Sequence, residues 1–177
     1  YLSTVSPEGT IIEKNWLSGL NAPKGMAVVG DKLYVADIDT LRIITISKRV
    51  ISSSLPIDGA TFLNDVTADA QGNVYISDTN TSIISRLEAD TLKPSSWLQD
   101  ATNLPGLNGL LAEKDRLVVV TTVARTGEGL LKAIDLATKN ITTIATVVPR
   151  GLFPKNTSLD GVTSNGQGGY YVTDYDN

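Results

Sequence analysis

The chain of 177 residues contains one short pattern four times. The pattern opens at Lys24, Asn64, Asn108 and Asp160, so successive copies are 40, 44 and 52 residues apart. Each copy begins with a short apolar segment and continues through a turn into a second β-rich segment, namely KLYVAD, NVYISD, RLVVVT and GYYVTD. A period of about 40 to 50 residues indicates an architecture in which one supersecondary unit is repeated in space.

Each repeat is predicted to contain four short strands. Turn residues separate the first two strands in every copy: Gly30-Asp31, Gln71-Gly72-Asn73, Lys114-Asp115 and Gly166-Gln167-Gly168. A third strand follows in three copies (LRIITI, SIISRL and LLKAID), and a fourth lies near residues 50–51, 96–98 and 141–144. Since there is almost no helical periodicity, we predict an all-β fold, a β-propeller of four-stranded blades with boundaries near residues 24, 64, 108 and 160. One such sheet cannot bury both faces alone, whereas radial stacking covers each sheet with its neighbours.

The two ends of the chain carry parts of a repeat. Residues 1–20 predict a third and a fourth strand (YLSTVS and IIEKNWL), whereas residues 160–177 contain only a first and a second strand. These parts could be complementary halves of one blade that closes a four-bladed ring, or they could belong to a larger ring. Because the sequence stops at YDN, directly after a strand, we favour the larger ring. We therefore expect residues 1–177 to form one propeller domain, with about four blades' worth of sequence, that is incomplete by itself.

The composition restricts the chemistry and the partners. The absence of cysteine and histidine excludes disulfides, thiol nucleophiles, Ser-His-Asp triads and His-ligated zinc sites. A net charge of −4 argues against a nucleic-acid partner, and no apolar run approaches the roughly 18 residues that span a membrane. Since Tyr1 is not a start methionine, we expect that an upstream segment, such as an export signal, has been removed.

Four stretches of the chain carry a family resemblance. FLNDVTADAQGNVYISDT, GLNGLLAEKDRLVVV and LDGVTSNGQGGYYVTD resemble three successive blades of the SMP-30/gluconolactonase/LRE-like propellers, which share their strand-turn-strand pattern with NHL-type repeats. GLNAPKGMAVVGDKLYVAD is similar to the preceding blade in the exported bacterial branch of that family. The resemblance implies a six-bladed ring, a divalent cation on its central axis and, in the best-known members, hydrolysis of sugar lactones. It also implies a periplasmic or extracellular location.

The resemblance also implies which residues form the site. An axial metal ligand of the family lies in an Asn-Gly pair, matched by Asn108, and another in an Asp-Gly pair, matched by Asp160. The Asn-Asp pair near metal and substrate matches Asn64 and Asp65, and Lys24 occupies the axial position of its own repeat. A further glutamate ligand of the family would lie upstream of this sequence.

These residue types suit a hard cation. If the first strands point their opening residues toward the axis, the metal ligands Asn64, Asn108 and Asp160 would supply two amide oxygens and one carboxylate. We expect Ca²⁺, with Mg²⁺, Mn²⁺ and Zn²⁺ as alternatives. Asp160 would also be catalytic by accepting a proton from an activated water. Asn64 and Lys24 would bind the substrate, and Lys24 could attract an anionic group or neutralise Asp160.

A structural interpretation of the same positions stays open. Asn and Asp at the start of a strand often hydrogen-bond the backbone two residues on, and a following glycine fits a turn. On this interpretation Asp65 is structural, and Asp37, Asp78 and Asp174 share a repeated turn role. Phe62 occupies the position at which catalytic members often carry an arginine. The sequence therefore leaves two functions open: a metal-dependent lactone or ester hydrolase, or a non-catalytic propeller that binds a small molecule or another protein at its axial face.

Overall fold

The computed structural model describes residues 1–148 and 157–175. These residues form sixteen strands and no helix, and so contain no helix that could span a membrane. The strands are β1 (Leu2–Val5), β2 (Ile11–Leu17), β3 (Pro23–Val29), β4 (Lys32–Asp37), β5 (Thr40–Thr45), β6 (Val50–Pro56), β7 (Leu63–Ala68), β8 (Val74–Asp78), β9 (Ile83–Leu87), β10 (Ser95–Gln99), β11 (Leu110–Ala112), β12 (Arg116–Val123), β13 (Glu128–Asp135), β14 (Ile141–Val147), β15 (Leu159–Ser164) and β16 (Tyr170–Asp174).

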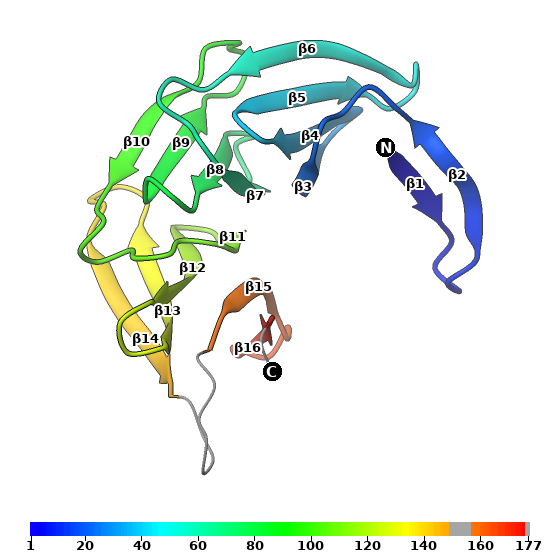
Figure 1. The fold of residues 1–177 in the computed structure, drawn as a ribbon. Coiled ribbons are helices and arrows are strands. Elements are labelled where there is room, and N and C mark those ends of the chain that lie inside the picture. The colour runs from blue at the N-terminus through cyan, green and yellow to red at the C-terminus, as the bar shows by residue number, and fades with distance from the viewer. Residues whose placement is uncertain (149–156, 176–177) are drawn as a thin grey trace.

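The strands form antiparallel sheets that radiate from a common axis. Three sheets have four strands each, β3–β6, β7–β10 and β11–β14, and every strand pairs with its neighbour in sequence. Figure 1 shows β3, β7, β11 and β15 innermost and β6, β10 and β14 outermost. The all-β fold predicted from the repeat is therefore confirmed as a partial propeller of about four blades.

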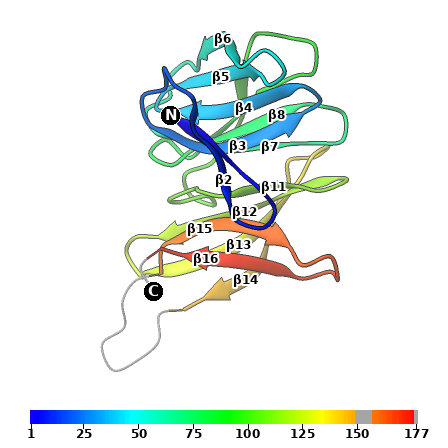
Figure 2. The same ribbon diagram turned by 90° about the vertical axis from the view of Figure 1, so that its right-hand side faces the viewer.

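The two terminal hairpins do not join. β1–β2 and β15–β16 form separate two-stranded sheets, and they lie on the two sides of the gap in the arc (Figure 1). Figure 2 shows β15–β16 apart from the sheet β3–β6 as well. In the described residues, the alternative of a closed four-bladed ring is therefore wrong. β1 pairs with β2 and β15 pairs with β16, and each hairpin packs on the blade next to it in sequence: Leu2 and Leu17 pack with Val35, and Leu159 packs with Val118.

The core lies between the blades. All five residues of β8 are buried because neighbouring blades cover both faces of its sheet. Successive side chains alternate accordingly, so that Ile76 belongs to the cluster shared with β3–β6 and Tyr75 to the cluster shared with β11–β14. Trp97 packs edge-on against Tyr75, with ring centroids 5.3 Å apart at 77°.

A repeated aspartate fixes the loop that leads into the first strand of a blade. Asp78 accepts hydrogen bonds from the backbone N–H groups of residues 61–62 at 2.6 and 2.9 Å, and from that of Thr81 at 2.9 Å. Asp37 accepts two N–H groups of the corresponding loop at 2.9 and 2.7 Å, and Asp174 accepts the N–H of Ser158 at 2.9 Å. Burial alone would raise the pKa of Asp78, but these hydrogen bonds outweigh it and hold the pKa below its ordinary value. The structural role expected for these three aspartates is what the geometry shows.

Candidate functional site

A β-bulge lies near the start of three innermost strands. The pairing register shifts between Pro23 and Met26 in β3, between Leu63 and Val66 in β7, and between Leu159 and Val162 in β15. The residues inside these shifts are the repeated pairs 24–25, 64–65 and 160–161. Because a bulge disrupts regular pairing and re-aims side chains, it explains how both residues of a pair can face the axis.

In the third repeat, a different arrangement holds the pair Asn108-Gly109. Here the strand β11 begins only at Leu110, two residues after the pair opens at Asn108. The Asn108 N–H donates to the carbonyl of Val120 at 3.0 Å, and the Val120 N–H donates to the carbonyl of Gly109 at 3.1 Å. The pair is therefore held against β12 by backbone bonds that lie outside the regular ladder.

The glycines of these pairs allow the innermost strands to approach one another. None of Gly25, Gly109 and Gly161 has a left-handed φ, so they are not needed for turn geometry. A Cβ on Gly109 would collide with the carbonyl oxygen of Asp160, and a Cβ on Gly25 would collide with the side chain of Asp65. The interpretation of Gly109 and Gly161 as turn residues is therefore wrong: Gly109 is required by close packing, and a Cβ on Gly161 would lie 3.3 Å from a threonine hydroxyl.

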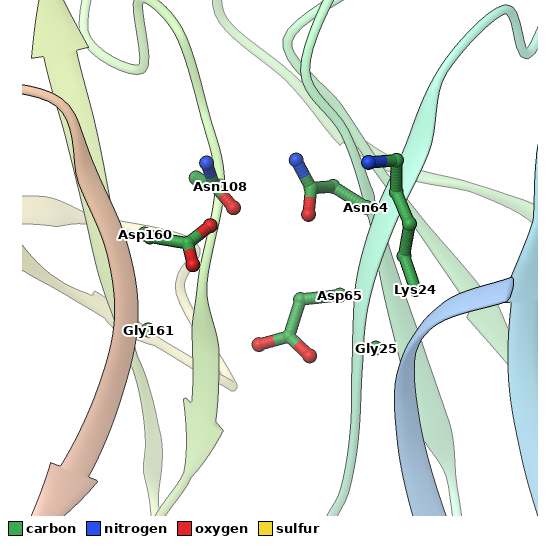
Figure 3. Close-up of a pocket in the computed structure, with 7 residues that line it drawn as sticks. All are labelled: Lys24, Gly25, Asn64, Asp65, Asn108, Asp160 and Gly161. Carbon is green, nitrogen blue, oxygen red and sulfur yellow. The ribbon is translucent and has the colours of Figure 1, made fainter. Parts of the chain in front are cut away.

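The repeated pairs line one cavity on the axis. Its volume is about 270 Å³, and its lining consists of Lys24, Gly25, Asn64, Asp65, Asn108, Asp160 and Gly161. Figure 3 shows Asn108 and Asp160 facing the cavity from one side, and Asn64, Asp65 and Lys24 from the other. The structure thus brings together the four residues that the sequence analysis predicts as metal or substrate ligands, and Asp65, which the resemblance placed near them, lies in the same lining.

Two of the side chains that could supply an oxygen ligand have no hydrogen-bond partner in the described parts of the chain. These are Asn108, which is half-buried, and Asp160, which is exposed. Neither side chain bonds the backbone two residues on, so the structural interpretation does not hold for these two positions. Asn64 differs because its Nδ2 donates to Thr79 Oγ1 at 2.9 Å, which leaves its Oδ1 as the group that can bind a ligand.

Asp65 combines a structural role with a place in the cavity. Its Oδ1 accepts the Val66 N–H at 2.8 Å, and its Oδ2 accepts the Leu110 N–H of the next blade at 2.7 Å. Burial raises the pKa of Asp65, the two backbone N–H groups oppose that rise, and the charge of Asp160 adds to it. The cavity therefore holds two carboxylates whose mutual repulsion a cation would relieve.

Lys24 lies beside an aromatic ring rather than beside a carboxylate. Its Nζ is 4.6 Å from the centroid of the Phe62 ring, which is the distance of a cation–π interaction. Among the described residues Lys24 forms no ion pair within 4.0 Å, so it does not neutralise Asp160 directly. This role of Phe62 could not be predicted from local sequence patterns, because the contact joins two adjacent blades.

The donor set decides which cations suit the cavity. The described residues contain no group of three or more Asp, Glu, His or Cys side chains that could hold a metal ion. The axial donors are instead two carboxylates and two carboxamides, all of which bind through oxygen. Such a set fits Ca²⁺ or Mg²⁺, with waters completing the shell, better than Zn²⁺, which prefers nitrogen and sulfur.

Comparison with solved structures agrees with the fold. No protein-family model and no curated protein matches the chain. Virginiamycin B lyase from Staphylococcus aureus matches with a TM-score of 0.71 and 14% identity over 98% of this chain and 56% of the lyase. A chain of the nidogen/laminin complex matches with a TM-score of 0.61 and 13% identity over 88% and 73% of the two chains. The extracellular domain of a one-component system from B. thetaiotaomicron has a TM-score of 0.64 and 15% identity over 96% and 21%.

The chain is a partial β-propeller. It spans about half the length of the lyase, and at this level of identity the matches show the fold alone.

Proposed function

We propose that the axial cavity binds a divalent cation, Ca²⁺ in the first place, through Asp160, Asn108 and Asn64. The observation that carries the proposal is that the Asp160 carboxylate and the Asn108 carboxamide face one cavity and form no hydrogen bond within residues 1–148 and 157–175. Unpaired polar groups that converge on one point suit a hard cation because each can supply an oxygen. The resemblance to SMP-30/gluconolactonase-like propellers, which bind a cation on the axis, points the same way.

The reaction that fits this site is the hydrolysis of a lactone or a related ester. A cation bound there would polarise the substrate carbonyl and lower the pKa of a bound water. The Asp160 carboxylate is the group that could accept the proton of the water, since no hydrogen bond to the described residues engages it. The Lys24 ammonium would attract an anionic substituent of a small molecule bound in the cavity.

Binding without catalysis is the second candidate. It is favoured by Phe62, which replaces an expected arginine and holds Lys24 against its ring instead of leaving it to contact a substrate. On this proposal the axial face binds a small molecule or a protein. A matched propeller chain is part of the nidogen/laminin complex, and another match is an extracellular domain, which is in keeping with a periplasmic or extracellular location for this protein.

Calcium titration by calorimetry tests the cation site. We expect saturable binding in the unmodified protein, its loss in Asp160→Asn, and weakening in Asn108→Ala. Asp58→Asn is the matched control because Asp58 is an exposed aspartate outside the cavity. Absence of calcium, magnesium and manganese binding in the unmodified protein would refute the cation site.

A lactone-hydrolysis assay then separates the two candidates. If the site is catalytic, a panel of small lactones should contain one whose hydrolysis requires the cation, stops with a chelator and is lost in Asp160→Asn. Cation binding without any such turnover would favour the binding propeller.

A further inference from the structure

Two hydrogen bonds from the sheet β7–β10 hold the opening of the next blade. Ser77 Oγ donates to the carbonyl oxygen of Asn108 at 2.7 Å, and Asp65 Oδ2 accepts the N–H of Leu110 at 2.7 Å. These contacts fix the backbone on both sides of Gly109. Because one bond lies before Gly109 and the other after it, residues 108–110 cannot rotate without breaking one of the two bonds.

Ser77 and Asp65 act together. The Asp65 N–H donates to Ser77 Oγ at 2.9 Å. The hydroxyl thus accepts a hydrogen bond from its own blade and donates its single proton to Asn108 of the next blade. Ser77 is completely buried, and water therefore cannot replace the hydroxyl without a rearrangement of the core. The bulge of β7 is thereby connected directly to the Asn108 backbone.

The same hydroxyl position recurs in the last repeat. Thr173 occupies the place of Ser77 in its hairpin, and its Oγ1 accepts the N–H of Gly161 at 2.8 Å. In these two repeats, a hydroxyl near the end of the second strand thus supports the bulge of the first strand. Thr173 also shows that a threonine hydroxyl can form this bond, at a position that is exposed in the last repeat.

The contact at Gly109 transmits the position of this segment to the neighbouring site residue. Because a Cβ on Gly109 would collide with the Asp160 carbonyl, the two backbones are already in close contact. A displacement of residues 108–110 therefore moves both Asn108 and the backbone of Asp160. The two oxygen donors without a hydrogen-bond partner in the described residues, Asn108 and Asp160, therefore depend on the same support.

We propose that Ser77 and Asp65 are positioning residues for the axial site, which hold residues 108–110 so that the Asn108 carboxamide faces the cavity. The functional part of this inference rests on the proposed cation site. Neither the Ser77 hydroxyl nor its bond to Asn108 lies in the cavity lining, so Ser77 acts through Asn108 rather than on the ligand.

The experiment compares Ser77→Ala with Ser77→Thr in the whole chain. Ser85→Ala is the matched control, because Ser85 is a buried serine of the same sheet and forms no hydrogen bond to the next blade in the described residues. The first readout is amide NMR without any cation: the resonances of Asn108 and Leu110 and the hydrogen-exchange rate of the Leu110 N–H. We expect Ser77→Ala to shift these resonances and to speed the exchange roughly tenfold, and Ser77→Thr to restore both.

The second readout is the calcium affinity of the same three variants. Loss of a group that orients a metal ligand commonly weakens binding by roughly 10- to 100-fold, and we expect a loss in this range for Ser77→Ala alone. If the NMR of Ser77→Ala matches that of Ser85→Ala, the positioning role is overturned whether or not calcium binds. If calcium binds but Ser77→Ala binds it as tightly as the control, the role in the site is likewise overturned. Absence of calcium binding in the unmodified protein removes the cation site and with it the functional half of the inference, while the NMR still decides the structural half.

Discussion

Replacing Asp78 with alanine should destabilise the protein severely. Asp78 is only 2% exposed, and its carboxylate accepts hydrogen bonds from three backbone N–H groups of two different loops. Alanine leaves these part-buried donors without an acceptor, and each of the three should then cost about 1–2 kcal/mol. Since removal of a buried carboxylate returns part of that cost, we expect a loss of about 3–6 kcal/mol from the free energy of unfolding.

Urea unfolding followed by circular dichroism and tryptophan fluorescence measures this loss. Asp135→Ala is the matched control, because Asp135 accepts the N–H groups of Ala137 and Thr138 in an exposed turn where water can replace it. We expect the control to be much less affected. Asp78→Asn should fall between the two, because a carboxamide retains one acceptor oxygen but turns an N–H group toward the donors.

The pH dependence gives an independent test of the same hydrogen bonds. The pKa of Asp78 is lower in the folded protein than in an unfolded chain. The ionised side chain therefore contributes to the free energy of unfolding above the unfolded pKa, and this contribution is lost as the pH falls through the folded pKa. The unmodified protein should therefore lose stability below about pH 4, and Asp78→Ala should lose less over the same interval. A loss below about 1 kcal/mol at pH 7, or the same acid sensitivity in both proteins, would refute this account of the loop.

Three further changes test other parts of the fold. Gly109→Ala should cost about 1–3 kcal/mol and weaken calcium binding, because the new Cβ meets the Asp160 carbonyl, whereas Gly161→Ala should be milder; chemical unfolding and calorimetry measure the two effects. Trp97→Ala should lower the free energy of unfolding by about 3–5 kcal/mol, because it removes a buried ring from between two blades. Thermal unfolding measures this loss, and a clearly smaller one would contradict the prediction. Burial lowers the pKa of Lys132, so the stability of the unmodified protein should rise as the pH increases toward about 10. Urea unfolding between about pH 7 and 10 measures this rise, and Lys132→Met should abolish it. The same dependence of stability on pH in both proteins would contradict the prediction.

The strands and turns could be predicted from sequence because their signals are local. The continuous β-rich run in KLYVAD and the glycine of Gln71-Gly72-Asn73 each identify an element without reference to the rest of the chain. The convergence of Lys24, Asn64, Asn108 and Asp160 on one cavity followed from their common position in the repeat, since equivalent residues of a propeller lie at equivalent distances from the axis.

The contacts between blades could not be predicted in this way. The bond from Ser77 to Asn108 joins residues 31 positions apart, and the contact of Lys24 with Phe62 depends on how two adjacent sheets are stacked. Local patterns contain no information about which hydroxyl of one blade meets which carbonyl of the next. For the same reason the glycine after Asn108 resembled a turn residue, although its neighbour in space is Asp160.

The residue after each axial position shows how the repeat has diverged. Three repeats carry glycine there, and only the second carries an aspartate, Asp65. That carboxylate can reach the Leu110 N–H of the following blade because the preceding blade has Gly25, at which any Cβ would collide with Asp65. The aspartate and the glycine are therefore a matched pair across two blades. One side chain thus packs against Gly25 of the preceding innermost strand, bonds Leu110 of the following one, and places a second carboxylate in the cavity beside Asp160. It adds the negative charge on which the proposed cation binding would depend.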